Sequence, residues 1–228
     1  MESIVCWACM SHRPFKDRLY AEFARVGGAL ASEKRLELLD LLAQAPRHVE
    51  ALAAETEMSV ANVSQHLQVL RRARLVETDR DGTKVLYRLA DDRVLQLWIS
   101  LRSVAEARLA EVEQITREFA VEGADEAPVA RSGLEALVAG GDVVVIDVRP
   151  PLEYEHGHLP DAISLPLEEL IVRLAELPRD RRIVAYCRGA YCLFADEAVA
   201  LLRRHGFDAH RLEGGWPEWR AEGRPVVS

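Results

Sequence analysis

The first 120 residues carry an almost wholly helical pattern of apolar positions. Phe15, Leu19, Phe23 and Val26 recur at three- and four-residue spacing, as one face of a helix requires. A leucine-rich segment begins after Ser32, which has the position of an N-cap, and further helices are predicted at 49–55 and 59–73. The turn residues at 79–82, followed by period-two alternation over 85–89, predict a β-hairpin.

One long helix is predicted over 91–120, and its apolar positions form a single seam. That seam consists of Val94, Leu97, Trp98, Leu101, Ala105, Leu109, Val112, Ile115 and Phe119. A small domain cannot cover so long an apolar face alone, so we expect the remainder to pack against a partner subunit.

The pattern changes after a segment at 121–130 that contains Gly, Pro and acidic residues and is typical of a linker. Short apolar strands at 143–146 and 183–186 end in Asp147 and Cys187, and a helix is predicted over 193–205. Strands that alternate with helices imply a parallel sheet with its active groups beyond the strand C-termini. We therefore predict an α+β chain of two domains, at 10–120 and 131–228, joined by the linker.

Composition narrows the class of protein. The chain has 228 residues, 49% of them hydrophobic, which suffices for packed cores. We see no apolar run near the ~20 residues of a membrane span and no secretory signal, so we expect a cytoplasmic protein without a membrane partner. Four cysteines are too few for a disulfide scaffold.

The net charge of −8 is unevenly distributed. Residues 1–120 hold 17 basic and 18 acidic side chains, whereas 121–228 hold 12 and 19. Residues 59–88 include six basic and three acidic side chains, a local charge of +3. The acidity belongs to the second half, so the first half remains suited to meet DNA.

The segment 59–72 follows a short helix and a loop, as the second helix of a helix-turn-helix does. Val60, Val63, Leu67 and Leu70 are predicted to form its core face. The remaining positions offer amide, hydroxyl and imidazole groups suited to base edges, and basic groups suited to phosphates. The candidate DNA-binding residues are Asn62, Ser64, Gln65, His66, Gln68, Arg71 and Arg72 on the helix, with Arg80, Lys84 and Arg88 on the hairpin.

Residues 15–119 resemble the ArsR/SmtB family of dimeric winged-helix repressors. The resemblance rests on Leu36-Glu-Leu-Leu-Asp-Leu-Leu, Ser59-Val-Ala-Asn-Val-Ser-Gln-His-Leu and Leu70-Arg-Arg-Ala-Arg-Leu-Val. It implies a winged helix-turn-helix, a homodimer formed through the first and last helices, and a double-stranded DNA operator read by Ser64, Gln65 and His66.

The chain departs from the metal-sensing members of that family. No cysteine lies in 47–52, where a thiolate pair would stand, and 91–120 contains no histidine. Cys6 and Cys9 remain as a C-x-x-C pair near His12, which is too few ligands for tetrahedral zinc. Inert thiols, or translation from Met10, are the preferred interpretations over a metal or redox site, and we predict no metal and no cofactor.

Cys187-Arg-Gly-Ala-Tyr-Cys192 connects a predicted strand to a predicted helix. Such a loop directs backbone N–H groups inward at the positive end of a helix, which stabilises a thiolate and binds an anion. Cys187 is the candidate nucleophile, Gly189 gives the loop its freedom and Arg188 is a candidate anion contact. The arginine that would complete a C-x5-R phosphate loop is missing, because that position is Leu193.

Residues 131–228 resemble the single-domain rhodanese family. The resemblance rests on the Cys187 loop and on Val145-Ile-Asp-Val-Arg149, Glu153-Tyr-Glu-His-Gly-His-Leu-Pro160, Ala162-Ile-Ser-Leu-Pro166 and Leu212-Glu-Gly-Gly-Trp-Pro-Glu-Trp219. It implies a parallel α/β domain in which Cys187 takes sulfur from thiosulfate or another sulfane donor. The persulfide, held by the amides of Arg188, Gly189, Ala190, Tyr191 and Cys192, then passes sulfur to cyanide, a thiol or a protein cysteine.

Other residues of this half receive supporting roles. Asp147 and Arg149 are expected to support the loop, and His156 and His158 to be structural. Cys192 has two open interpretations: a thiol that resolves a Cys187 persulfide into a disulfide, or a small packed residue.

The leading hypothesis is a DNA-binding regulator in which sulfur uptake on Cys187 alters DNA affinity. The alternative is a thiosulfate sulfurtransferase whose winged helix does not respond. A metal-responsive repressor using Cys6 and Cys9 ranks third.

Overall fold

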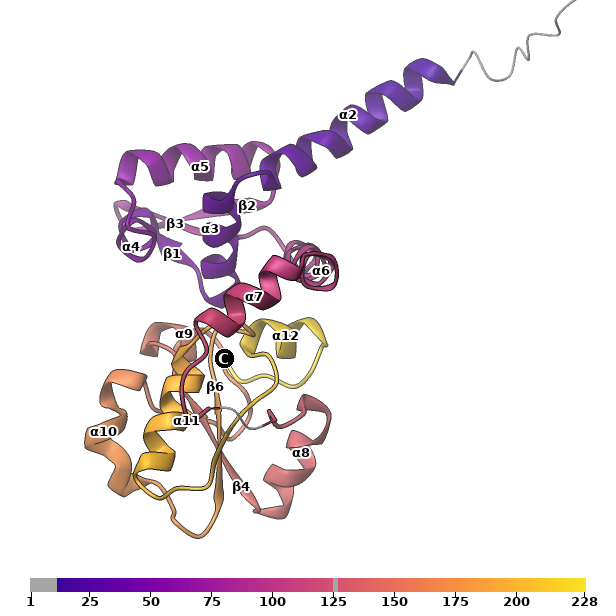
Figure 1. Ribbon diagram of the computed structural model, residues 1–228. Coiled ribbons are helices and arrows are strands. Elements are labelled where there is room, and N and C mark those ends of the chain that lie inside the picture. Colours follow the sequence, from indigo (N-terminus) through magenta and orange to yellow (C-terminus); the bar gives the residue numbers. More distant parts are fainter. Residues whose placement is uncertain (1–11, 125–126) are drawn as a thin grey trace, which may run out of the picture. The chain divides into compact units, whose positions relative to one another are not determined.

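The computed structural model describes residues 12–124 and 127–228 (Figure 1). Cys6, Cys9 and Met10 lie outside the described residues. The chain divides into two compact units. The first comprises the described residues up to Leu42 together with Pro46–Val94, and the second comprises Ala43–Ala45 and Leu95–Ser228.

The first unit is helical with a small antiparallel sheet. Its elements are α2 (Arg13–Leu30), α3 (Glu33–Gln44), β1 (Arg47–His48), α4 (Val49–Glu55), α5 (Val60–Arg72), β2 (Val76–Asp81) and β3 (Lys84–Leu89). The sheet order is β1-β3-β2, with Thr78 opposite Tyr87. The hairpin tip lies later than the predicted 79–82, because β2 continues through Asp81 and Gly82 turns the chain with a φ of +60°.

The core of this unit is built from leucines of α3, α4 and α5. Leu38, Leu52, Leu67 and Leu70 are fully buried, and Val63 is buried with them. The prediction that Val60 belongs to this core face is wrong, since its side chain is 44% exposed. Val60 begins α5, directly after the N-cap Ser59, and that first turn projects beyond the packed helices.

The helix predicted over 91–120 is two helices, α6 (Asp92–Arg108) and α7 (Ala110–Glu118). Leu109 between them has an extended backbone, with φ −112° and ψ 105°. Neither proline nor glycine lies at this break, so no local helix breaker explains it. Apolar residues of α7 line a cavity together with Tyr191 and Leu193, and no residue of this helix is buried.

The second unit contains a four-stranded parallel sheet in the order β5-β4-β6-β7 (Figure 1). The elements after α7 are α8 (Arg131–Gly140), β4 (Val143–Asp147), α9 (Pro151–His156), β5 (Ile163–Ser164), η1 (Leu167–Glu169), α10 (Leu170–Arg173), η2 (Leu174–Glu176), β6 (Arg182–Tyr186), α11 (Phe194–Arg204), β7 (Ala209–Arg211) and α12 (Trp216–Ala221). The predicted fold class, with its hairpin wing and parallel sheet, is confirmed.

Alternate residues of the central strands β4 and β6 enter two separate cores. Ile146 and Ala185 pack with α10 and α11 on one face of the sheet. Val145, Val184 and Tyr186 pack with α8 and the tryptophans of α12 on the other. Both faces of the sheet are therefore covered by helices, and the edge beyond the strand C-termini is left for loops.

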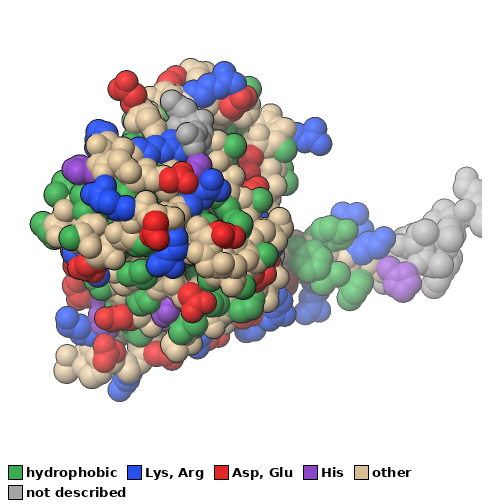
Figure 2. Space-filling model, turned by 90° about the horizontal axis from the view of Figure 1, so that it is seen from below, with side chains coloured by type: hydrophobic (Ala, Val, Ile, Leu, Met, Phe, Trp, Pro, Cys, Tyr) green, Lys and Arg blue, Asp and Glu red, His purple; other side chains and the backbone are tan. Residues whose placement is uncertain are grey.

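The surface has no large field of one sign on the face drawn in Figure 2, where acidic and basic side chains are interspersed. Such a face does not provide the concentrated positive potential that attracts nucleic acid. Among the described helices, none is both long and apolar enough to cross a membrane.

Candidate functional site

Cys187 lies immediately after the central strand β6, in the loop that leads to α11, and its side chain is fully buried. The backbone N–H of Trp216 donates to the Cys187 carbonyl oxygen at 3.1 Å, which ties this loop to the start of α12. Gly189 has a φ of +141°, a conformation that side-chain-bearing residues avoid. Gly215 is also required, because a Cβ there would overlap the backbone of Cys187 and Gly189.

The two thiols of the loop affect each other's pKa. The Cys187 thiol donates to the Cys192 carbonyl oxygen at 3.2 Å. Burial, followed by the interaction with Cys192, raises the pKa of Cys187 well above its usual value, although N–H groups of Gly189 and Ala195 act in the opposite direction. The hydrogen bond from Cys187 lowers the pKa of Cys192 to about 7. The expectation that the loop lowers the Cys187 pKa is therefore not met in this structure.

Arg188 is held by a carboxylate. Its Nη2 lies 2.6 Å from Oε1 of Glu153, a fully buried residue of α9, and its Nε donates to the same oxygen at 2.8 Å. This differs from the expected role of Arg188 as an anion contact, because its charge is already matched by Glu153. Glu153 belongs to one of the motifs that resemble rhodanese, but nothing in the sequence indicated this role for it.

Asp147 and Arg149 form a fully buried ion pair at the end of β4, with Arg149 Nη2 2.6 Å from Asp147 Oδ2. The Tyr186 hydroxyl donates to the same carboxylate at 2.6 Å, and Arg149 Nη2 also donates to the Gly157 carbonyl oxygen at 2.7 Å. Burial, followed by the charge of Asp147 and its hydrogen bond, raises the pKa of Tyr186, so that it stays protonated as a donor. These groups hold the strand ends in place. Among the described residues, the hydrogen bonds of the Cys187 sulfur go to the carbonyl oxygens of Gly189 and Cys192 and not to these groups.

The two histidines noted in the sequence have different surroundings. The ring of His158 stacks on Tyr154 with centroids 3.8 Å apart, and its Nδ1 lies 3.0 Å from the Tyr154 carbonyl oxygen. His156 is exposed, and partial desolvation together with the neighbouring Arg220 and Arg149 lowers its pKa, which favours its neutral form.

Residues of α6 contact the Cys187 loop. Arg102 forms an ion pair with Glu218 of α12, and both would lie within 3.5 Å of a Cβ on Gly189. The Arg102 guanidinium lies 5.8 Å from the centroid of the Tyr191 ring, and its Nε is 3.2 Å from Glu106. Burial and a hydrogen bond with Glu106 raise the pKa of Tyr191 to about 12. Arg102 and Glu106 could not be recognised from the sequence, because they resemble any charged pair on a helix.

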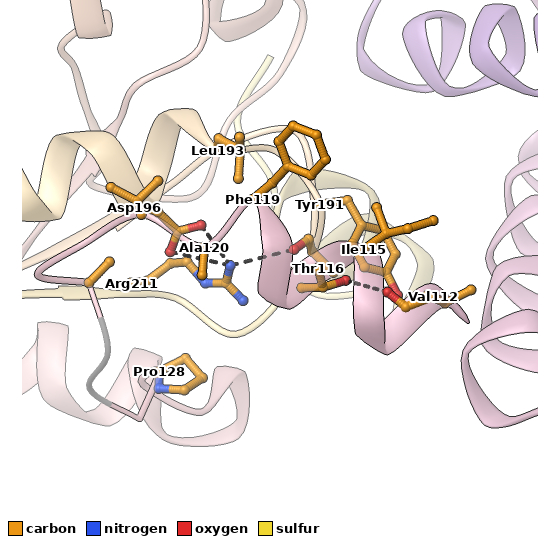
Figure 3. Close-up of a pocket in the computed structure, with 13 residues that line it drawn as sticks. Val112, Ile115, Thr116, Phe119, Ala120, Pro128, Tyr191, Leu193, Asp196 and Arg211 are labelled. Carbon is orange, nitrogen blue, oxygen red and sulfur yellow. Dashed lines mark hydrogen bonds and ion pairs between the residues drawn. The ribbon is translucent and has the colours of Figure 1, made fainter. Parts of the chain in front are cut away.

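A cavity of about 650 Å³ lies beside the same loop (Figure 3). Its apolar wall comes from Val112 and Ile115 of α7 and from Phe119 directly after that helix, and Tyr191 and Leu193 face this wall. At the other end Arg211 pairs with Asp196 at 3.1 Å and reaches the Ala190 carbonyl oxygen at 3.4 Å. Loop residues Ala190 and Tyr191 therefore have one side against a space large enough for a small molecule.

The candidate DNA-binding residues of α5 lie on its solvent side. Ser59 caps the helix by accepting a hydrogen bond from the Asn62 N–H at 3.2 Å. Ser64 and His66 are partly exposed, and the fully exposed members are Asn62, Gln65, Gln68, Arg71 and Arg72. The helix thus presents its amide, hydroxyl and imidazole groups outward while Val63, Leu67 and Leu70 hold it to the core.

The three basic residues of the wing differ in their surroundings. Arg80 and Lys84 are exposed near the hairpin tip. Arg88 lies toward the base, where it pairs with Glu77 and Asp79, each at 2.7 Å. The expected phosphate contact by Arg88 is weakened, because two carboxylates already compete for its guanidinium.

Potential metal ligands are not gathered in the part of the chain that the structure describes. No group of three or more His, Cys, Asp or Glu side chains there has an arrangement that would hold an ion.

Comparison with known proteins places both halves of the chain. Residues 32–78 match the family model "Bacterial regulatory protein, arsR family", and 131–222 match "Rhodanese-like domain". The HTH-type transcriptional regulator Rv0324 of Mycobacterium tuberculosis is 46% identical over 211 residues, 92% of each chain. A sulfurtransferase of Allochromatium vinosum is 36% identical over 88 residues, 38% of this chain and 80% of that protein.

A solved structure with related sequence is the homodimeric winged helix-turn-helix DNA-binding domain of a possible ArsR-family regulator from Mycobacterium bovis. It is 45% identical, covers 41% of this chain and 87% of its own, and has a TM-score of 0.40. The relative that matches along nearly the whole length, together with the two family models, shows that the chain belongs to the arsR family of HTH-type transcriptional regulators and carries a rhodanese-like domain in its second half.

Proposed function

We propose that this regulator takes up sulfane sulfur on Cys187 and that the uptake changes its affinity for operator DNA. The observation that carries the proposal is the contact between the Cys187 loop and α6. Only two residues separate the end of the wing strand β3 from the start of that helix, so it is continuous in the chain with the DNA-binding part. The loop and the wing are thus joined by one short stretch of backbone and one helix.

Sulfur uptake follows from the chemistry of the thiol pair. The Cys192 thiolate accepts the Cys187 proton, and the Cys187 thiolate attacks the outer sulfur of thiosulfate. A bond forms between the two sulfurs, the S–S bond of thiosulfate breaks, and sulfite leaves with the electron pair. The product is a Cys187 persulfide, and no oxidant or cofactor is consumed. A thiol, cyanide or a protein cysteine then removes the outer sulfur.

The burial of Cys187 supports a coupling between uptake and α6. Its side chain has no exposed surface, so an added sulfur atom needs room that the closed loop does not offer. Gly189 lies under the Arg102–Glu218 ion pair, and Tyr191 is held by Arg102 and Glu106. A loop that shifts to admit sulfur therefore alters the contacts that it makes with α6.

We further propose that DNA is bound by a homodimer. Helix α2 carries Phe15, Tyr20 and Phe23 with more than half of each side chain exposed, and a helix with such an apolar face favours a partner. A second copy of the chain is the partner expected from the family. Size-exclusion chromatography with light scattering tests this, and a monomeric full chain at micromolar concentration would contradict it.

The coupling is tested by titrating the gene's own upstream DNA at fixed salt with untreated protein, thiosulfate-treated protein and treated Cys187→Ala protein. We expect treatment to change the affinity of the wild type about tenfold or more, a coupling of about 1.4 kcal/mol, and to leave the variant unchanged. Equal binding by all three proteins would refute sulfur-dependent regulation.

A variant on α6 examines the route. Arg102→Gln removes the ion pair with Glu218, whereas Arg93→Gln changes an exposed arginine on the same helix and serves as the matched control. We expect the DNA affinity of Arg102→Gln to respond less to thiosulfate than that of the control. Sulfur uptake is measured in both proteins, so that a loss of uptake is distinguished from a loss of coupling.

A sulfurtransferase with an unresponsive winged helix is the second candidate function. It is favoured by the cavity beside Ala190 and Tyr191, which provides space for a small-molecule donor or acceptor next to the loop. Rapid steady-state turnover of thiosulfate with cyanide, combined with unchanged DNA affinity, would select this function over the first.

A further inference from the structure

The loop between β6 and α11 brings its two cysteines together. A turn in which the Cys192 N–H donates to the Gly189 carbonyl oxygen at 3.2 Å folds the chain back on itself. The Cys187 thiol consequently donates to the Cys192 carbonyl oxygen at 3.2 Å, which places the two cysteines against each other. Both are free thiols in the structure.

The surroundings of Cys192 favour its thiolate. Backbone N–H groups of Phe194 and Arg188 and the Arg188 charge stabilise a negative sulfur there, in addition to the hydrogen bond from Cys187. Its side chain is partly exposed, whereas that of Cys187 is not. A residue present only to fill space would not need these N–H groups.

We propose that Cys192 is the resolving thiol of the site: it attacks the Cys187 persulfide and converts it to a Cys187–Cys192 disulfide. The inference rests on the proposed uptake of sulfur by Cys187. The Cys192 thiolate forms a bond to the Cys187 Sγ, the bond from that Sγ to the outer sulfur breaks, and hydrosulfide leaves with the electron pair.

Attack on the inner sulfur is the preferred direction because of the leaving group. Hydrosulfide is a weaker base than an alkyl thiolate and leaves faster, whereas attack on the outer sulfur would expel the buried Cys187 thiolate. The persulfide itself is the oxidant, so the step needs no other. Two equivalents of a small thiol restore the dithiol and are themselves oxidised to a disulfide.

Such a site gives the sulfur signal a second form. A persulfide adds one atom inside a packed loop, whereas a disulfide binds the first and last residues of that loop to each other. The bridged loop keeps its state after the donor is gone, until a thiol reduces it. The regulator would then respond to sulfane sulfur and be reset by the reducing power of small thiols.

The test compares the wild type, Cys192→Ser and Cys187→Ser as full-length chains, each treated anaerobically with thiosulfate and separated from it. Intact mass spectrometry and a colorimetric sulfide assay are the readouts. We expect the wild type to lose the mass of two hydrogen atoms and to release one hydrosulfide per chain. Cys192→Ser is expected to gain one sulfur atom and release none, and Cys187→Ser to remain unchanged.

Trypsin locates the bond, because it cleaves after Arg188 and so separates the two cysteines. A non-reduced digest of treated wild type should contain the two peptides joined, and an untreated anaerobic digest should not. A wild type that gains one sulfur and releases no hydrosulfide overturns the resolving role while preserving sulfur uptake. If neither the wild type nor Cys192→Ser reacts, uptake on Cys187 fails and the inference falls with it.

Discussion

Gly215 offers a sharp test of the packing around Cys187. A Cβ added there would lie 2.5 Å from the Gly189 nitrogen and 2.8 Å from its Cα, and closer still to the Cys187 carbonyl oxygen. All three are backbone atoms, which have no rotamer by which to move away. The φ of Gly215 is −169°, an extended value open to any residue, so the close approach alone requires glycine.

The size of the effect follows from these distances. Ordinary van der Waals contact begins at 3.4 Å, so the Gly189 backbone would have to retreat by about 0.9 Å. Forcing one extra carbon into such a packed site costs about 1–3 kcal/mol of the free energy of unfolding. A displacement near 1 Å at a reacting group also lowers rates by about 10²-fold. Gly215→Ala should therefore lose both stability and sulfur transfer.

Urea unfolding followed by circular dichroism measures the stability, and sulfite release from thiosulfate with cyanide as acceptor measures the transfer. Gly133→Ala on α8 is the matched control, because an added Cβ there meets no atom within 4 Å. The control should be unchanged or more stable by about 0.5 kcal/mol, since alanine favours a helix over glycine. A Gly215→Ala protein as stable and as active as this control would refute the reasoning.

Three further outcomes follow from the same structure. Asp147→Asn leaves the buried Arg149 charge unmatched and should lower the free energy of unfolding in urea by about 3–5 kcal/mol. The double variant Asp147→Leu with Arg149→Met should recover most of that stability, and an equal loss in both proteins would contradict this account. Iodoacetamide should alkylate the Cys192 peptide at a rate that rises with pH through about 7, since the thiolate is the reacting form. Cys187→Ala should move this midpoint to higher pH, because it removes the main cause of the lowered Cys192 pKa, and an unchanged midpoint would contradict that cause. Ser59→Ala should destabilise the first unit by about 1 kcal/mol through loss of the N-cap, detectable by thermal unfolding, whereas no loss would show that the cap is dispensable.

Local patterns predicted most of the fold. The strand ending at Cys187, the glycine two residues later and the helix after it are features of contiguous sequence, and the structure has them in that order. The winged helix-turn-helix was equally accessible, because periods of two and 3.6 residues separate its hairpin from its helices. Boundaries that depend on tertiary packing were not, as the exposed Val60 and the break at Leu109 demonstrate.

The electrostatics of the site were predicted less well, for a physical reason. The loop amides that favour a Cys187 thiolate can be inferred from sequence, whereas its complete burial and its hydrogen bond to Cys192 arise only in the folded chain. Burial has the larger effect and raises the pKa of Cys187, whereas the pKa of Cys192 is lowered. Arg188 was likewise assigned to an anion, since nothing in the sequence indicates that the distant Glu153 occupies its guanidinium.

The contact between Arg102 and the Cys187 loop has a consequence in the opposite direction. Coupling between two binding equilibria is reciprocal, so a loop state that changes operator affinity by some factor is itself changed by the operator by the same factor. Under the proposed coupling, protein on its operator and protein free in solution hold sulfur with different affinities. The DNA then acts as an effector of the sulfur site, and each promoter sets the sulfur level at which its own regulator responds.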